Sequence, residues 1–382
     1  MKLLVIGHTY VTPFAQSKFA AMKQLDPSLQ LRIVTPPEVG HVFMKHRYSR
    51  HPGLSLEETV VIPIIIGQTH MSYVLHPGLL SDIMRRFKPD HIHIEEDPHS
   101  LIGVESVSLA QLACPKATVS FFIWDNLARE PRFPLNLIKK TLTYYSFAHT
   151  DLVICGNLEA EHLLKSVKAY PGRTSVLPQI GVDPEDYDGS YPKTLAENLG
   201  KTPDAPLIGF IGRLVPEKGV LLLLEALLHL QMLPWKLLIV GSGTLREEIH
   251  TLWKSKLGER LILVDSVPHA QVSQYLRCLD IFVLPSYSTP VWKEQFGLTL
   301  AQAMMAGVAC IGSSSGAIPE VIGMAGLVFK EKNVEDLENA LKQMLTSEIL
   351  RCELGQSART FALKHYTNTS IAKAYLNVFG NL

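Results

Sequence analysis

The chain has 382 residues, of which 47% are hydrophobic, so it can fill the cores of two domains of about 180 residues each. Lys plus Arg and Asp plus Glu both number 36, and a formal net charge of zero disfavours a nucleic-acid binder. The 5 cysteines are scattered without metal-ligand spacing, which fits a reduced, cytosolic protein.

The chain carries neither of the usual hydrophobic targeting patterns. Residues 1–7 are too short and too soon followed by polar residues to form a signal peptide. The longest uncharged apolar candidate, Thr59–Gly67, is the size of a strand and falls short of the roughly 18 residues that a membrane span needs. We therefore expect a cytoplasmic protein.

The first half of the chain alternates strands with helices. Short apolar, β-branched runs are typical of buried parallel strands. They occur at Lys2–Gly7, Leu31–Thr35, Val60–Ile66, His91–Ile94, Ala117–Ile123 and Leu152–Cys155. Helical patterns at Gly78–Phe87 and Ser106–Ala113 lie between some of them. This alternation predicts a doubly wound, Rossmann-like α/β domain.

The second half repeats the alternation. Strands are predicted at Leu207–Ile211, Lys236–Val240, Leu261–Leu263, Ile281–Pro285 and Val308–Ile311. Helices are predicted at Gly219–Gln231, Leu245–Leu257 and Val334–Leu345. The Gly-, Pro- and Asp-rich segment from Pro178 to about Pro206 is predicted to link the halves, and Ser357–Phe379 has helical spacing.

One carboxylate stands directly before a glycine turn and a small-residue helix in the segment Glu294–Gly307. The first turn of a helix carries unpaired N–H groups and attracts phosphate. We therefore expect the backbone of Gly297, Leu298 and Thr299 to bind phosphates. Because a carboxylate beside phosphate is unfavourable unless it binds something neutral, Glu294 favours a nucleotide-sugar pocket.

Two cations follow the predicted strand Leu207–Ile211, in the segment Gly212–Gly219. Arg213 can clamp phosphate oxygens bidentately, and Lys218 supplies a mobile point charge. Cations at a helix start oppose the helix dipole, so the two together need a functional reason. We expect them to neutralise a diphosphate leaving group.

The spacing of these two segments resembles glycosyltransferase family 4. The matching residues read Gly-Arg-Leu-x-x-x-Lys-Gly at 212–219 and Glu-x-Phe-Gly-Leu-x-Leu-x-x-Ala-Met-x-x-Gly at 294–307, with Pro285–Ser286 and Gly316–Glu320 in support. The resemblance implies the GT-B fold, in which two Rossmann-like doubly wound domains face each other across a cleft. It covers the second half of the chain strongly and the first half loosely.

The resemblance also implies a domain layout. Residues 1–180 would form the acceptor-binding domain and residues 181–360 the nucleotide-sugar donor domain. Residues 361–382 would form a C-terminal helix that crosses back to the first domain. The activity would be that of a retaining hexosyltransferase that uses a nucleoside-diphosphate sugar, more readily a UDP-sugar than a GDP-sugar.

Donor-side roles follow from the same resemblance. Glu294 would contact the sugar hydroxyls, while Gly243 and Val267 would lie near the nucleotide. Gln302 stands where the family usually has a second Glu that accepts hydrogen bonds from the ribose. A Gln binds ribose more weakly, since charge-assisted hydrogen bonds are about twice as strong as neutral ones. Gln302 either weakens ribose binding or marks a degenerate, non-catalytic member.

The motifs of the acceptor-binding domain match the family less well. The family's Gly-Gly loop after the first strand is a single Gly here, and its His-Asp pair after the strand Ala117–Ile123 is replaced. Polar residues that follow predicted strands are the candidates for acceptor contacts. They are His8, Thr9, Thr12, Glu96, Asp97, Trp124, Asp125 and Asn126. Alternatively, Trp124 is a buried residue that packs in the core of the domain.

No metal or other cofactor is expected. Asp186-Tyr187-Asp188 matches the metal-binding Asp-x-Asp pattern. Because it lies in the predicted linker, we expect it to form a turn. The basic-aromatic stretch Arg129–Phe147 can lie on an anionic membrane or form an ordinary domain helix. Peripheral contact with the inner face of a membrane therefore stays an alternative.

We predict a glycosyltransferase that moves a sugar to a saccharide, lipid-linked or small-molecule acceptor. Two rivals stay open: a nucleotide-sugar epimerase, and a degenerate GT-B binding or regulatory subunit. The sequence does not identify the sugar, the acceptor or the oligomeric state.

Overall fold

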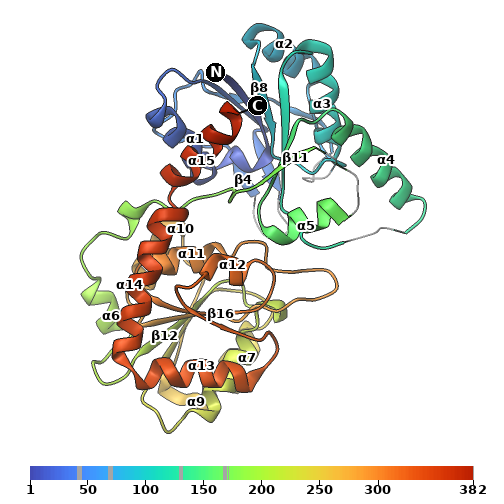
Figure 1. Cartoon of the computed structure of the whole chain (residues 1–382). Helices are drawn as coiled ribbons and strands as arrows, with labels where there is room; N and C mark the ends of the chain where they lie inside the picture. The colour runs from blue at the N-terminus through green and yellow to red at the C-terminus, as the bar shows by residue number, and fades with distance from the viewer. Residues whose placement is uncertain (41–44, 68–71, 129–131, 167–169, 171, 382) are drawn as a thin grey trace. The chain divides into compact units, whose positions relative to one another are not determined.

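The computed structural model describes residues 1–40, 45–67, 72–128, 132–166, 170 and 172–381. These residues form two compact units (Figure 1). Unit 1 comprises Met1–Gly181 and the segment from Asn368 to the C-terminus, and unit 2 comprises Val182–Thr367. The chain therefore passes between the units twice, at positions 181–182 and 367–368.

Unit 1 is built on a parallel sheet with the strand order β11-β10-β9-β8-β1-β2-β5. The strands are β1 (Lys2–Ile6), β2 (Gln30–Thr35), β5 (Thr59–Val61), β8 (His91–Ile94), β9 (Thr118–Ile123), β10 (Leu152–Cys155) and β11 (Arg173–Val176). Two antiparallel pairs join β3 (Glu38–Gly40) to β4 (Lys45–Arg47), and β6 (Ile64–Ile66) to β7 (Val74–Leu75).

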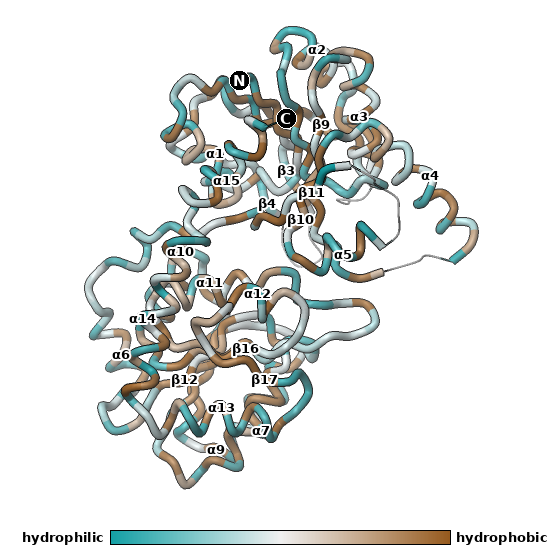
Figure 2. Tube along the Cα trace, viewed as in Figure 1, coloured by the Kyte–Doolittle hydropathy of each residue, from teal (hydrophilic) through white to brown (hydrophobic). Residues whose placement is uncertain are grey.

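Helices cover both faces of this sheet. Their bounds are α1 (Pro13–Leu25), α2 (Pro77–Phe87), α3 (Leu101–Ala113), α4 (Leu135–Ala148), α5 (Leu158–Ser166) and α15 (Asn368–Gly380). One core cluster joins α1 and α15, which lie side by side in Figure 1, to one face of the sheet. A second cluster packs α2 to α5 against the other face. Because both faces are buried, strands such as β1 and β9 are largely apolar, and Figure 2 shows the hydropathy along the chain.

Unit 2 repeats this plan with the strand order β14-β13-β12-β15-β16-β17, again in parallel. The strands are β12 (Leu207–Ile211), β13 (Lys236–Val240), β14 (Leu261–Val264), β15 (Ile281–Leu284), β16 (Ala309–Ser313) and β17 (Leu327–Phe329). The predicted architecture of two doubly wound Rossmann-like domains is confirmed.

The helices of unit 2 lie on both faces of its sheet. They are α6 (Lys193–Asn198), α7 (Val220–His229), α8 (Arg246–Glu248), α9 (Lys254–Leu257), α10 (His269–Leu276), α11 (Leu298–Met305), α12 (Ile318–Ile322), α13 (Val334–Thr346) and α14 (Glu348–His365). A π-helical turn at Ile249–Trp253 joins α8 to α9. The core cluster around α7 and α13 fills one face, and α11, α12 and α14 pack together with β16.

Three sequence-based boundaries are wrong. The run Val60–Ile66 is not one strand: β5 joins the parallel sheet and β6 pairs with β7, because Pro63 between them lacks the N–H that a continuing ladder needs. The helical segment Ser357–Phe379 is interrupted at Tyr366, whose carbonyl oxygen accepts a hydrogen bond from the Val182 N–H at 2.8 Å. Much of the expected linker, from Val182 onward, belongs to unit 2 and includes α6.

Unit 1 buries two histidines on β8. His91 lies between the hydroxyls of Thr118 (2.6 Å) and Ser120 (2.8 Å), and Ser120 also contacts Nδ1 of His93 at 2.7 Å. Burial, assisted by neighbouring His93, lowers the pKa of His91 to about 3. Neutral His91 therefore fits the folded state, whereas the unfolded chain takes up a proton below its ordinary value of about 6.5.

We expect unit 1 to lose stability on acidification because of His91. Its contribution is complete above pH 6.5 and falls progressively toward pH 3, by about 2 kcal/mol between pH 7 and pH 5. Hydrogen exchange of the β8 and β9 amides, corrected for intrinsic rates, measures this. His91→Gln should flatten the pH dependence by that amount, and equal slopes in both proteins would contradict the prediction.

Candidate functional site

In unit 2, the loop after β12 holds a lysine against a carboxylate. Lys218 Nζ lies 2.7 Å from Glu294 Oε2, and the Ser286 hydroxyl donates to the same oxygen at 3.0 Å. The side chains of Lys218 and Glu294 are 16% and 9% exposed, so the pair is largely shielded from water. Lys218 also lies 4.7 Å from the centroid of the Trp292 ring, within range of a cation–π contact.

Gly219 makes this arrangement possible. Its φ is +70°, and a Cβ there would lie 1.9 Å from the carbonyl oxygen of Pro285. The loop can therefore pack directly on the end of β15, which brings Lys218 to Ser286 and Glu294. Arg213, at the start of the same loop, is exposed.

The N-terminus of α11 follows three residues after Glu294. Gly297 adopts a φ of +81° at the N-cap, and as a glycine it provides no side-chain cap. The first-turn N–H groups of Leu298 and Thr299 therefore have no partner within the helix. The side chain of Glu294 lies beside this N-cap, since a Cβ on Gly297 would lie 3.8 Å from Glu294 Cγ.

Gln302 lies one turn further along α11 and is buried. A side-chain hydrogen bond joins it to the hydroxyl of Tyr187, whose pKa burial raises well above its ordinary value. The neighbouring Asp188 forms an ion pair with Arg359. Gln302 therefore has a protein partner in this structure, and its contact with ribose stays a prediction.

Gly243 and Val267 follow β13 and β14. Leu214 N–H donates to the Ser242 carbonyl at 2.9 Å, and a Cβ on Gly243 would lie 2.4 Å from the Leu214 carbonyl oxygen. This tight turn thus packs on the Arg213 loop. Val267 is half-buried. Neither contact tests their predicted roles near the nucleotide.

In unit 1, the acids that follow β8 have separate partners. Glu95 is buried and forms an ion pair with Lys18, while Gln179 Nε2 donates to its other oxygen at 2.6 Å. Burial alone would raise the pKa of Glu95, but Lys18 and His93 hold it at about 2. Glu95 is a structural residue that ties β8 to α1.

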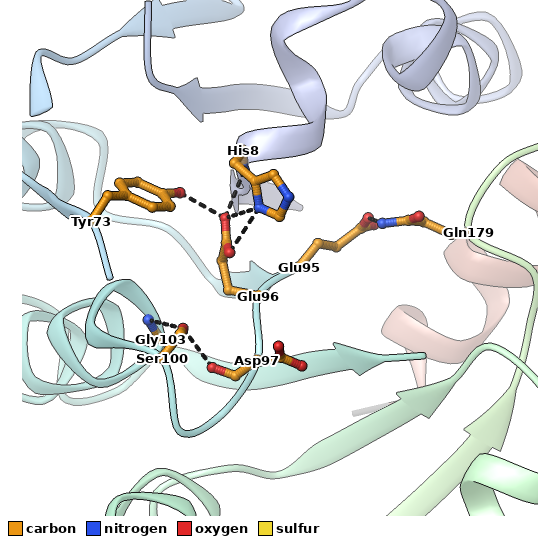
Figure 3. Close-up of polar contacts among 8 residues, drawn as sticks. All are labelled: His8, Tyr73, Glu95, Glu96, Asp97, Ser100, Gly103 and Gln179. Carbon is orange, nitrogen blue, oxygen red and sulfur yellow. Dashed lines mark hydrogen bonds and ion pairs between the residues drawn. The ribbon is translucent and has the colours of Figure 1, made fainter. Parts of the chain in front are cut away.

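Glu96 is the centre of a second group, with His8 and Tyr73 (Figure 3). His8 Nδ1 lies 2.9 Å from both carboxylate oxygens, the His8 N–H donates at 2.7 Å, and the Tyr73 hydroxyl donates at 2.6 Å. Burial opposes a charge on His8, but the Glu96 carboxylate outweighs it and raises the pKa above 6.5. His8 and Glu96 therefore bind each other, and their contact with an acceptor stays a prediction.

Asp97 and Asp125 line a cavity of about 410 Å³ within unit 1. The Asp97 carbonyl accepts from the Ser100 hydroxyl at 2.6 Å, and Ser100 caps α3 through the Gly103 N–H. In Figure 3, Asp97 lies apart from the His8–Glu96–Tyr73 group. The cavity brings together acids that follow two neighbouring strands.

Three of the other acceptor-side candidates have structural partners. Trp124 Nε1 donates to Gln179 at 2.8 Å, and its ring packs so tightly on Gly156 that a Cβ there would lie 2.2 Å away. Asn126 donates to Glu159 at 3.1 Å, and Thr12 caps α1 at the Ala15 N–H. Thr9 Oγ1 is buried without a hydrogen-bond partner among the described residues.

Comparison with known proteins identifies the fold. Residues 193–361 match the model of the family described as Glycosyl transferases group 1. A glycosyltransferase from Rickettsia africae superposes with a TM-score of 0.75 at 16% identity, covering 100% of this chain and 98% of that chain. Alr3699/HepE of Anabaena in complex with UDP gives 0.72 at 18% identity, with 100% of both chains covered. The chain has the GT-B fold.

Curated relatives match more locally. Sulfoquinovosyl transferase SQD2 of Arabidopsis thaliana is 25% identical over 299 residues, which cover 76% of this chain and 56% of the relative. A D-inositol 3-phosphate glycosyltransferase of Stackebrandtia nassauensis is 28% identical over 249 residues, which cover 61% of this chain and 55% of the relative. The chain thus spans about half the length of these curated relatives.

The described residues contain neither a metal-binding cluster nor a membrane-spanning helix. Within the residues that the structure describes, no group of three or more His, Cys, Asp or Glu side chains is placed to hold a metal ion. The helices of the same residues include none that is long and apolar enough to cross a membrane. Arg129 of the basic-aromatic stretch lies outside the described residues.

Sequence reasoning missed several residues that organise the site. Ser286 and Trp292 contact the Lys218–Glu294 pair, and Tyr73 and Lys18 hold the acids after β8. Ser286 lies two positions after β15, in the Pro285–Ser286 motif that supports the family resemblance, so its position after a strand was a usable signal. Tyr73 and Lys18 stand far from those acids in the sequence and carry no such signal.

We expect Glu96 to control the protonation of His8. In Glu96→Gln the pKa of His8 should fall, because the charge and hydrogen bond of Glu96 are lost, while burial continues to lower this pKa and only the weaker attraction of Asp97 and Glu95 continues to raise it. Tyr73→Phe is the matched control, since it removes one hydrogen bond to Glu96 but leaves the charge. Imidazole resonances followed by NMR titration measure both, and an unchanged His8 pKa in Glu96→Gln would rule out this coupling.

Proposed function

We propose that the chain is a retaining glycosyltransferase of family 4 that transfers a hexose from a nucleoside-diphosphate sugar. The observation that carries the proposal is the largely shielded Lys218–Glu294 pair beside the uncapped N-terminus of α11. Cationic and N–H groups suited to phosphate thus adjoin a carboxylate suited to hydroxyls. The family-model match over residues 193–361 contains all of these groups.

The donor binds unit 2. Arg213 and Lys218 contact the diphosphate and stabilise the charge on the leaving group, and Gly297, Leu298 and Thr299 offer N–H groups to its oxygens. Glu294 binds the sugar hydroxyls, Gln302 the ribose, and Gly243 and Val267 lie along the nucleotide. Lys218 contacts Glu294 at 2.7 Å, so a bound diphosphate would compete with Glu294 for its ammonium.

The acceptor binds unit 1. Asp97 and Asp125 are the strongest candidates, since they line the cavity of about 410 Å³. His8, Thr9, Thr12, Glu96, Trp124 and Asn126 have roles in positioning the loops around it. The nucleotide is UDP rather than GDP, which the UDP complexes of the Anabaena structure support.

Replacing Lys218 should damage turnover more than stability. Lys218→Ala should lower kcat by roughly a hundredfold to a thousandfold, because one stabilising donor is lost in the transition state. Lys342→Ala, an exposed lysine of the same unit, is the control and should keep its activity. Donor consumption and the melting temperature are measured on both, and full activity in Lys218→Ala would remove Lys218 from the mechanism.

UDP should bind more tightly than GDP, ADP and TDP. Arg213→Ala should weaken UDP binding about tenfold to a hundredfold, because a charged hydrogen bond to the diphosphate is lost. Calorimetric titration measures both. Failure of every nucleotide to bind would favour the degenerate-subunit alternative. Conversion of the UDP-sugar without an acceptor would favour an epimerase.

Transfer should not depend on a metal. EDTA should leave the rate unchanged, since Arg213, Lys218 and the α11 N-terminus provide the charge that a metal would otherwise supply. The rate is measured with and without EDTA. Activity lost in EDTA and restored by magnesium would contradict metal independence while leaving the transfer reaction itself in place.

A further inference from the structure

The cavity in unit 1 has the size of a small-molecule site. Its volume of about 410 Å³ lies between the ends of β8 and β9 and the helices α4 and α5. Ligand sites typically measure about 300–1,000 Å³ and combine an apolar lining with a few placed polar groups. Its size therefore permits a ligand rather than a few waters.

The lining divides into apolar and polar parts. Leu127, Phe147, Leu163 and Leu164 contribute hydrocarbon and aromatic surface. The carboxyl-bearing residues follow strands β8 and β9 and can accept hydrogen bonds from hydroxyls. Lys139 and Lys140 of α4 also line the cavity, where their aliphatic stems suit an apolar ligand.

Helix α4 exposes more apolar surface than a helix on a sheet normally does. Phe147 is buried, yet Leu135, Leu137, Ile138 and Tyr144 are each more than half exposed, at 61%, 58%, 52% and 53%. Scattered exposed leucines need no explanation. Here they gather on the one helix that also walls the cavity, and Tyr144 belongs to both surfaces. Apolar surface therefore continues from the cavity lining onto the outside of α4.

We propose that this cavity holds the hydrocarbon part of an amphiphilic acceptor whose hydroxylated head lies at Asp97 and Asp125. The lining combines carboxylates with leucine and phenylalanine side chains, which matches a molecule with a hydroxylated part and a hydrocarbon part. A plain saccharide would leave the apolar lining unused. The inference rests on the proposed transfer function, because it names the class of acceptor.

The test uses octyl, decyl and dodecyl glucoside as probes, each below its micellar concentration, in calorimetric titrations. Each methylene that enters the cavity should tighten binding about fourfold, so two should give about fifteenfold. Thr143→Trp places an indole in the cavity from α4. It should weaken binding at least about tenfold, because at the same free energy per methylene it excludes two or more methylenes of the alkyl chain. Thr141→Trp is the matched control, since Thr141 is exposed on the same helix outside the lining, and should bind as the parent does.

Leu163→Asn keeps the test decisive where Thr143→Trp does not fold. It makes the wall polar and should flatten the dependence on chain length. Affinity that is independent of chain length, equal affinity in Thr143→Trp and Thr141→Trp, or glucose binding as tightly as its alkyl derivatives would each overturn the proposal.

UDP binding separates this proposal from the proposed function. UDP is expected to bind unit 2. Its affinity should therefore not change in the variants with substitutions on α4 and α5. A protein that binds UDP but shows no dependence on chain length loses the amphiphile inference alone. A protein that binds alkyl glucosides with that dependence but no nucleotide keeps the cavity site and loses the transfer function.

Discussion

Parallel strand pairing is the constraint on which both units depend. It places the carboxyl ends of neighbouring strands at one edge of a sheet, where loops can converge. In unit 1, His8, Asp97 and Asp125 follow β1, β8 and β9, which are neighbours in the sheet. In unit 2, the Arg213 and Ser286 loops follow the neighbouring strands β12 and β15. The topology therefore assembles each group of polar residues before any side chain forms a bond.

Electrostatics then gives the three consecutive acids after β8 different tasks. Glu95 points into the core, where an unpaired charge would be very costly, and Lys18 compensates it. Glu96 forms hydrogen bonds with His8 and Tyr73, and its carboxylate raises the pKa of His8. Asp97 lines the cavity. Glu95 and Glu96 are both buried, whereas Asp97 is partly exposed.

Sequence patterns predicted the sheets well because continuous apolar runs are required when both faces of a sheet are buried. The predicted strand at His91–Ile94 agrees with β8, whereas the run through Pro63 failed because one missing N–H outweighs hydropathy. Contacts between distant residues could not be predicted in the same way. Glu95 and Lys18 are separated by 77 positions, and Lys218 and Glu294 by 76. Nothing local to Glu95 distinguishes a structural acid from one that binds sugar.

Gln302 shows that a residue role inferred from a family resemblance depends on how buried the position is. A glutamate in this buried position of α11 would need a cation or several donors to offset its desolvation. The hydroxyl of Tyr187, whose pKa is raised by burial, is a neutral partner and suits an amide better than a second buried negative charge. Gln302 and Tyr187 therefore form a consistent neutral pair. The residue that departs from the family pattern is the one that its own surroundings favour, so the departure alone is weak evidence for a degenerate site.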